Sequence, residues 1–234
     1  MKQITVATYN IRHGYDVSYD WKRLASVIHA SGADMIGLQE IDMKTRRVAG
    51  RDTIEGLKEA TGFPYAHYIP AMDFDGGRYG TAILSRYPIR DPFVQSLDAG
   101  PYEPRAFGGV TVEIPDGVPL CFLNTHLSFK SKNKRCTQME EIAAWISTHI
   151  PTDMPLLLTG DFNTENFDAF SPIKELGYDL VNREDHRFDT FREPPAAIDN
   201  IVYRAGKLSP LDFGMIDKDT SDHNLLWCRF EIHA

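Results

Sequence analysis

Acidic, amide and imidazole side chains recur at the ends of apolar runs along this sequence. They occur in Tyr9-Asn10, Leu38-Gln39-Glu40, Asn124-Thr125-His126, Gly160-Asp161-Phe162-Asn163 and Ser221-Asp222-His223, and Asp199 lies in a further run. The ends of packed strands are where α/β proteins place their sites. Carboxylate and amide oxygens, without a Cys or paired-His ligand set, suit Mg²⁺ or Mn²⁺ better than Zn²⁺. The pattern therefore predicts a divalent-metal site surrounded by acid–base groups.

Each cluster also has a simpler interpretation. Gly160-Asp161 fits a turn with an Asx hydrogen bond, and Ser221-Asp222-His223 fits a polar turn. Glu40 taken alone could be a solvated carboxylate at a strand end, and His126 a histidine bonded to backbone. What favours chemistry is that all of these groups fall at the ends of strand-like runs in one chain.

The elements that must position these groups are short apolar strands with helical segments between some of them. Period-two and continuous apolar runs predict strands at 4–11, 34–41, 79–85, 109–114, 119–126, 155–163, 197–203 and 225–232. Helical spacing predicts helices after the N-cap residue Asp20, over 131–149, and over 168–176 before Gly177.

Strands outnumber helices in this prediction, and some strands are apolar on both faces. The run Pro155-Leu156-Leu157-Leu158 is an example. Such strands are buried on both sides, which indicates sheets packed on each other and covered by helices. The pattern predicts an α/β fold, and the length of 234 residues fits a single domain over 1–234.

Composition limits the partners and the compartment. The formal net charge of −8 gives no global positive field to draw the protein onto duplex nucleic acid. No run approaches the roughly 20 apolar residues of a membrane span, and the first residues are too polar for a signal peptide. The three cysteines have no CxxC spacing, and Cys121 and Cys228 lie in apolar runs, which is typical of reduced thiols. We expect a cytoplasmic monomer.

Together the clusters resemble the endonuclease/exonuclease/phosphatase superfamily, which includes DNase I-like phosphoesterases. The matching stretches appear in the family's order: YNIRHG at 9–14, IGLQEID at 36–42, YGTAILSRYPI at 79–89, FLNTHL at 122–127, LLLTGDFNT at 156–164, AIDNIVY at 197–203 and SDHN at 221–224. The resemblance implies a four-layer sandwich, with two packed mixed β-sheets flanked by helices. It also implies a Mg²⁺- or Mn²⁺-dependent phosphoesterase, with phosphodiesters as the expected substrates.

The resemblance also implies roles for individual residues. Glu40 resembles the principal metal carboxylate, with Asn10 and Asp222 completing or supporting the metal shell. Asp161 resembles the residue that aligns and deprotonates the attacking water. The remaining implied roles are phosphate orientation by Asn163, phosphoryl binding by His223 held by Asp199, a leaving-group imidazole at His126, and a phosphate contact by Arg105.

The chain departs from some relatives at two positions. Asn200 stands after Asp199 where many relatives carry Tyr, and Arg12 stands where the abasic-site enzymes carry an acid. These departures argue against abasic-site specificity and leave the hydrolytic set complete.

Two basic segments follow strands that carry candidate residues. They are Lys44, Arg46, Arg47 and Arg51, and then Lys130, Lys132, Lys134 and Arg135. The second group begins a predicted helix, where positive charge opposes the macrodipole. We therefore predict that Lys132, Lys134 and Arg135 contact an anionic substrate group beyond the scissile phosphate, although solvated loops remain the alternative.

Several functions remain open at this stage. A metal-dependent hydrolase acting on a compact anionic small molecule or on a nucleic-acid end is the first hypothesis. The second is a catalytically inactive binding module on the same fold, which a complete set of site residues disfavours. A nucleotide-binding kinase or switch is disfavoured because neither GxxxxGK[ST] nor GxGxxG occurs.

Overall fold

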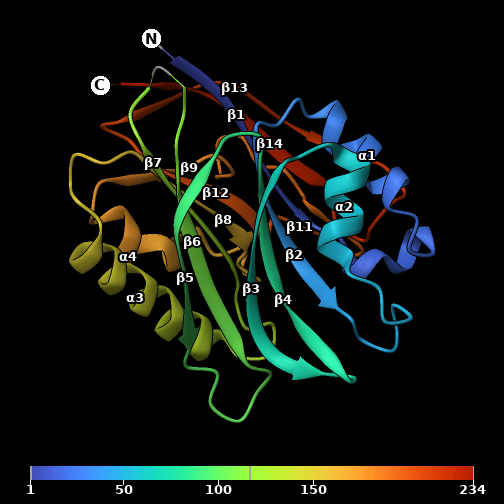
Figure 1. The fold of residues 1–234 in the computed structure, drawn as a ribbon. Coiled ribbons are helices and arrows are strands. Elements are labelled where there is room, and N and C mark those ends of the chain that lie inside the picture. The colour runs from blue at the N-terminus through green and yellow to red at the C-terminus, as the bar shows by residue number, and fades with distance from the viewer. Residues whose placement is uncertain (1, 116, 234) are drawn as a thin grey trace.

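Two six-stranded β-sheets pack face to face, with helices on their outer faces, in the computed structural model, which describes residues 2–115 and 117–233 (Figure 1). The first sheet has the order β13-β14-β1-β2-β4-β3, and the second has the order β5-β6-β7-β8-β12-β9. Parallel and antiparallel pairings occur in both sheets. The predicted four-layer sandwich of mixed sheets is confirmed.

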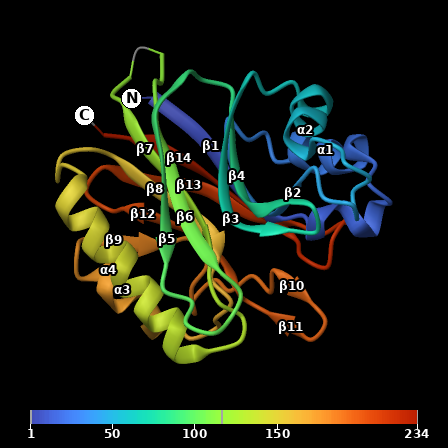
Figure 2. The ribbon, with the colours of Figure 1, turned by 60° about the horizontal axis from the view of Figure 1, so that its bottom comes forward.

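The strands of the first sheet are β1 (Lys2–Asn10), β2 (Met35–Met43), β3 (Tyr65–Phe74), β4 (Gly77–Ser85), β13 (Leu208–Ile216) and β14 (Leu225–Ile232). Those of the second are β5 (Ile89–Leu97), β6 (Arg105–Val112), β7 (Leu120–His126), β8 (Leu156–Asp161), β9 (Tyr178–Leu180) and β12 (Asp199–Arg204). A small hairpin, β10 (Phe191–Arg192) and β11 (Pro195–Ala196), projects beside them (Figure 2).

Helices cover the outer face of each sheet. The helices α1 (Trp21–Ala30) and α2 (Thr53–Thr61) lie on the first sheet, after the 3₁₀ helix η1 (Arg12–Val17). The helices α3 (Lys132–His149) and α4 (Ser171–Lys174), with the 3₁₀ helix η2 (Phe167–Phe170), lie on the second.

Alternation along the central strands divides the apolar side chains among the layers. In β7, Leu120 and Phe122 point into the core between the sheets, while Cys121 and Leu123 pack toward α3. Successive strand residues point to opposite faces, so a strand covered on both sides must be apolar throughout. This explains the continuous apolar runs in the sequence.

The predicted strands all form, with ends shifted by a few residues, and two helix starts are confirmed. The Asp20 side chain accepts a hydrogen bond from Lys22 N at 3.0 Å, and Ser131 caps α3. The continuous helix predicted over 168–176 is wrong, because a 3₁₀ helix and a four-residue α-helix replace it. Pro172 lies at this junction and has no N–H to donate to the preceding turn.

Cys121 and Cys228 are buried and unbridged. Among the residues described, no helix combines the length and apolar character needed to cross a membrane.

Candidate active site

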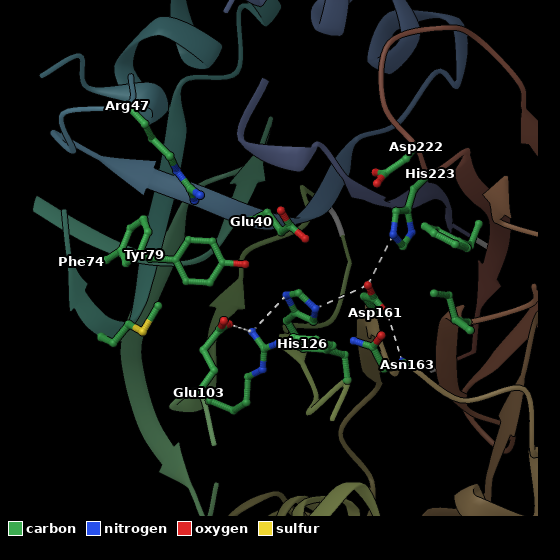
Figure 3. Close-up of a pocket in the computed structure, with 15 residues that line it drawn as sticks. Glu40, Arg47, Phe74, Tyr79, Glu103, His126, Asp161, Asn163, Asp222 and His223 are labelled. Carbon is green, nitrogen blue, oxygen red and sulfur yellow. Dashed lines mark hydrogen bonds and ion pairs between the residues drawn. The ribbon is translucent and has the colours of Figure 1, made fainter. Parts of the chain in front are cut away.

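The candidate residues converge at one end of the sandwich. The carboxyl ends of β1, β7 and β8 and the start of β12 meet there, with His126 beside Asp161 in the parallel pairing and Asp199 opposite Asp161 in the antiparallel one. A cavity of about 410 Å³ opens at this point (Figure 3). Of the predicted residues, it is lined by Glu40, Arg105, His126, Asp161, Asn163, Asp222 and His223.

A β-bulge presents Glu40 to the cavity. The register between β2 and β4 shifts between Leu38 and Ile41, and Glu40 adopts a left-handed φ of +59°. Bulges redirect side chains at sheet ends near functional sites. Burial opposes ionisation of this carboxyl, but the nearby His13 and the Asn10 amide lower the pKa of Glu40 to about 2. Glu40 is therefore an anion at neutral pH.

Asn124 on the second sheet supplies hydrogen-bond donors to backbone carbonyls next to this bulge. Its side-chain amide donates to Leu38 O and Ala82 O, each at 2.9 Å, and its oxygen accepts from Gln39 at 2.7 Å. Gly37 makes this crossing possible, because a Cβ there would lie 2.6 Å from the Asn124 oxygen. Asn124 thus fixes the bulge that carries Glu40 and joins the two sheets.

We expect Asn124→Ala to destabilise the fold by about 2 kcal/mol or more, because buried carbonyls would lose their donor. Urea unfolding followed by circular dichroism measures this change. The control is Asn133→Ala, at an exposed position in α3, which should change stability by less than about 0.5 kcal/mol. Equal effects of the two substitutions would show that Asn124 has no special structural role.

Asp161 lies at the centre of the site. Its Oδ2 accepts a hydrogen bond from Asn10 at 3.1 Å and faces His126 Nε2 at 3.5 Å and His223 Nε2 at 3.7 Å. Its Oδ1 accepts from the Asn163 backbone N–H at 2.9 Å. Burial and the charge of Asp199 raise the pKa of Asp161, while His223 and these hydrogen bonds oppose the shift. A carboxylate with a raised pKa is suited to accepting a proton.

His223 is held between two buried carboxylates. Its Nδ1 lies 2.7 Å from Asp199 Oδ2, and its ring packs edge-on against Phe191. Burial opposes its charge, but Asp199 in particular raises the pKa of His223 to about 10. A charged imidazole presents an N–H at both nitrogens and cannot ligate a metal. The buried Asp161, Asp199 and His223 cluster is therefore better suited to holding a proton than a metal ion.

His126 has the opposite charge preference. Burial and the nearby Arg105 lower the pKa of His126 well below that of an ordinary histidine. Its Nδ1 lies 3.5 Å from Arg105 Nη1, and the same nitrogen of Arg105 is 2.6 Å from Glu103. The site thus contains one neutral and one charged imidazole on either side of Asp161.

Asn10 bridges the two sheets. Its amide nitrogen donates to Glu40 at 3.2 Å and to Asp161 at 3.1 Å, while its oxygen accepts from Arg12 N at 3.0 Å. In this arrangement Asn10 supports the two carboxylates, and its oxygen is directed away from them.

Asn163 and Asp222 complete the predicted set. Asn163, with a left-handed φ of +52°, donates from its side chain to Leu127 O at 3.0 Å. Asp222 lies 3.3 Å from Arg12 Nε, and its side chain is about a third exposed. Burial raises the pKa of Asp222 and Glu40 adds to the shift, which His223 and Arg12 oppose.

Glu40 and Asp222 fit a hard divalent cation. Both are carboxylates on the cavity wall, and the charge of Glu40 disfavours ionisation of Asp222 in the absence of a cation. None of the described residues lining the cavity is a cysteine. Oxygen donors of this kind suit Mg²⁺ or Mn²⁺.

Only one of the four basic residues predicted to contact substrate lines the cavity. Arg105 lines it, but Lys132, Lys134 and Arg135 do not. Lys134 pairs with Asp98 at 2.7 Å, and Arg135 donates to Ser128 O at 3.0 Å and to Phe129 O. These bonds direct the two cations to the protein's own loops, so the proposed substrate contact by this group has no support from their placement.

Sequence reasoning missed several lining residues. They are Met72, Phe74, Tyr79, Glu103, Phe129, Phe191 and Ile198, and Arg47 was assigned only to a basic segment. Phe129 follows the strand that ends at His126, so its place in the sequence was a usable signal. Phe74 lies on the edge strand β3, which the pattern did not predict.

Comparisons with known proteins agree with this fold. The model of the Endonuclease/Exonuclease/phosphatase family matches residues 7–223. An uncharacterized Escherichia coli protein, YbhP, is 24% identical over 193 residues, which cover 77% of this chain and 75% of that protein. The crystal structure of an endonuclease/exonuclease/phosphatase from Beutenbergia cavernae is 19% identical with a TM-score of 0.83, covering 100% of this chain and 72% of that one. D. rerio TDP2, complexed with a single-strand DNA product, is 18% identical with a TM-score of 0.76, covering 99% of this chain and 100% of that one.

Proposed function

Because the chain belongs to the endonuclease/exonuclease/phosphatase family, whose members are phosphoesterases, we propose that it is a metal-dependent hydrolase of phosphoester bonds, preferentially phosphodiesters. The observation that carries the proposal is the convergence of Asn10, His126 and His223 on the buried Asp161 carboxylate. A complete acid–base set in one cavity is what an in-line attack of water on phosphorus requires.

Asp161 has the role of general base. Asn10 orients its carboxylate, and the raised pKa favours uptake of a proton from the attacking water. Asn163 lies beside it and orients the phosphoryl group.

The two imidazoles have different roles. His223, charged and held by Asp199, donates a hydrogen bond from Nε2 to an anionic phosphoryl oxygen. His126, with its lowered pKa, lies by the leaving oxygen beside Arg105. A divalent cation bound by Glu40 and Asp222, when present, supplies positive charge that stabilises the phosphoryl oxygens.

A panel of phosphodiesters and phosphomonoesters, assayed with Mg²⁺ and with Mn²⁺, tests the proposed function. We expect turnover that EDTA abolishes and that either metal restores. Full activity of the metal-free protein would contradict the metal dependence. Binding of phosphoesters without turnover of any of them would favour the inactive binding module instead.

We expect Glu40→Gln to weaken Mn²⁺ binding about 10- to 100-fold, because it removes the carboxylate that remains charged at neutral pH. Isothermal titration calorimetry measures the affinity directly, without an assay of turnover. Glu113→Gln, at an exposed position away from the cavity, is the matched control. Unchanged Mn²⁺ affinity in Glu40→Gln would place the metal elsewhere.

An exonuclease-like action on nucleic-acid ends is the second candidate. It is favoured by the likeness to TDP2, which is described with a single-strand DNA product. A short oligonucleotide with a terminal phosphate, added to the panel, tests it.

A further inference from the structure

The turn that follows β1 has an unusual backbone. Arg12, His13 and Gly14 are consecutive residues with left-handed φ values of +45°, +44° and +83°. The Asn10 side chain accepts from Arg12 N at 3.0 Å, and Gly14 leaves room for Trp21, because a Cβ there would lie 2.5 Å from the Trp21 ring. Left-handed backbone at residues other than glycine costs free energy and clusters at functional sites. This turn fixes where the Arg12 and His13 side chains begin.

The turn brings one side chain to each proposed metal carboxylate. His13 Nδ1 lies 3.6 Å from Glu40 Oε2, and Arg12 Nε lies 3.3 Å from Asp222 Oδ2. Arginine keeps its charge at every working pH. Over residues 2–115 and 117–233, Arg12 is the one arginine or lysine in ion-pair contact with either carboxylate. The site thus has a fixed positive charge of its own beside one of the two proposed metal ligands.

Arg12 is shared between two carboxylates. Its Nη1 lies 3.1 Å from Asp16 Oδ1, one helical turn further along η1, while its Nε faces Asp222. A divalent cation held by Asp222 is repelled by a guanidinium that contacts the same carboxylate. The Arg12 side chain is 40% exposed, so solvent and salt weaken this repulsion without removing it.

We propose that Arg12 is a positioning residue that pairs with Asp222, competes there with the divalent cation and so limits the metal affinity of the site, and that Asp16 moderates this competition. The inference deepens the proposed function and rests on its metal site. It requires that removal of the Arg12 charge tighten metal binding, which is the opposite of what loss of a metal ligand such as Glu40 does.

Calorimetric titration with Mn²⁺ at about pH 8, above the ordinary range of a carboxyl pKa, tests this role without an assay of turnover. Arg12→Gln should lower the Kd for Mn²⁺ about three- to tenfold at low ionic strength, and the gain should shrink in about 0.5 M KCl. Arg12→Lys retains the charge and should stay closer to the native Kd than Arg12→Gln does. The matched control is Arg229→Gln, which breaks a similarly exposed pair with Asp212 outside the cavity and should leave the Kd unchanged.

Asp16→Asn should change the affinity in the other direction. Without Asp16 the guanidinium is neutralised less, so the Kd for Mn²⁺ should rise about two- to threefold. In an Arg12→Gln background the same substitution should have a smaller effect, because Asp16 acts through Arg12. A general effect of net charge would instead be equal in the two backgrounds.

An unchanged or raised Kd in Arg12→Gln would overturn the role of Arg12, and equal effects of Asp16→Asn in both backgrounds would overturn the role of Asp16. Circular dichroism checks that each variant folds. If Arg12→Gln does not fold, a Kd that is not raised in Asp16→Asn overturns the inference. Failure of the proposed function would look different: no ester would be turned over, while the Mn²⁺ affinities still changed in this order. A native protein that binds no Mn²⁺ would overturn the metal site and the role of Arg12 together.

Discussion

Asp161→Asn is expected to lower kcat by about 10²- to 10⁴-fold, the range for loss of a positioned general base. The amide is nearly isosteric with the carboxyl, so the protein should fold and bind Mn²⁺ as before. Asn cannot accept the proton of the attacking water. Steady-state kinetics with the best ester of the panel, together with Mn²⁺ titration, separate loss of rate from loss of metal.

The exposed Asp98 provides the matched control, since Asp98→Asn makes the same chemical change outside the cavity and should leave kcat unchanged. In the native enzyme the rate should fall as pH decreases through the pKa of Asp161, because protonation removes the base. Burial and Asp199 raise that pKa, so the acid limb should lie above the ordinary range of a carboxyl. An Asp161→Asn enzyme that retains the wild-type rate would exclude Asp161 as the base.

His223→Ala is expected to lower kcat by about 10²- to 10⁴-fold, because it removes a charged donor that lies beside Asp161. The sign of the pH dependence follows from its pKa of about 10. The imidazole is charged below this value and loses its charge above it. The rate should therefore persist to about pH 10 and fall beyond it, and not fall near pH 6.5.

Asp199→Asn tests the cause of this basic limb. The substitution removes the charge that raises the pKa of His223 while retaining a hydrogen-bond acceptor, so the limb should shift toward lower pH. The measurement is kcat against pH, with Mg²⁺, for the native enzyme and for Asp199→Asn. An unmoved limb in Asp199→Asn would assign the titration to another group.

The elements that could be predicted are those with a single dominant signal. The central strands, which are covered on both faces, are continuous apolar runs, as in Leu156–Asp161. The helices α1 and α3 have side-chain caps at Asp20 and Ser131. The edge strands β3, β5 and β13 were missed, because one side of each has no neighbour and their burial pattern does not alternate cleanly.

The candidate site shows the same limit. The positions of Asp161 and His126 follow from strands that end at them, so sequence alone could place them together. The bulge at Glu40 could not be predicted, because it depends on Asn124 from a strand far along the chain. The placement of Lys134 and Arg135 was likewise decided by partners in other segments, Asp98 and the loop at Phe129.

Asn124 of the second sheet bonds to the backbone of the first sheet, and Gly37, which has no side chain, leaves room for it. Glu40 belongs to one sheet and Asp161 to the other, so the distance between the proposed metal carboxylate and the proposed base is set by the spacing between the layers. Core side chains such as Phe122 and Phe230 help to set that spacing from far outside the cavity. Substitutions that change core volume can therefore tune the reaction rate while every residue of the site stays the same.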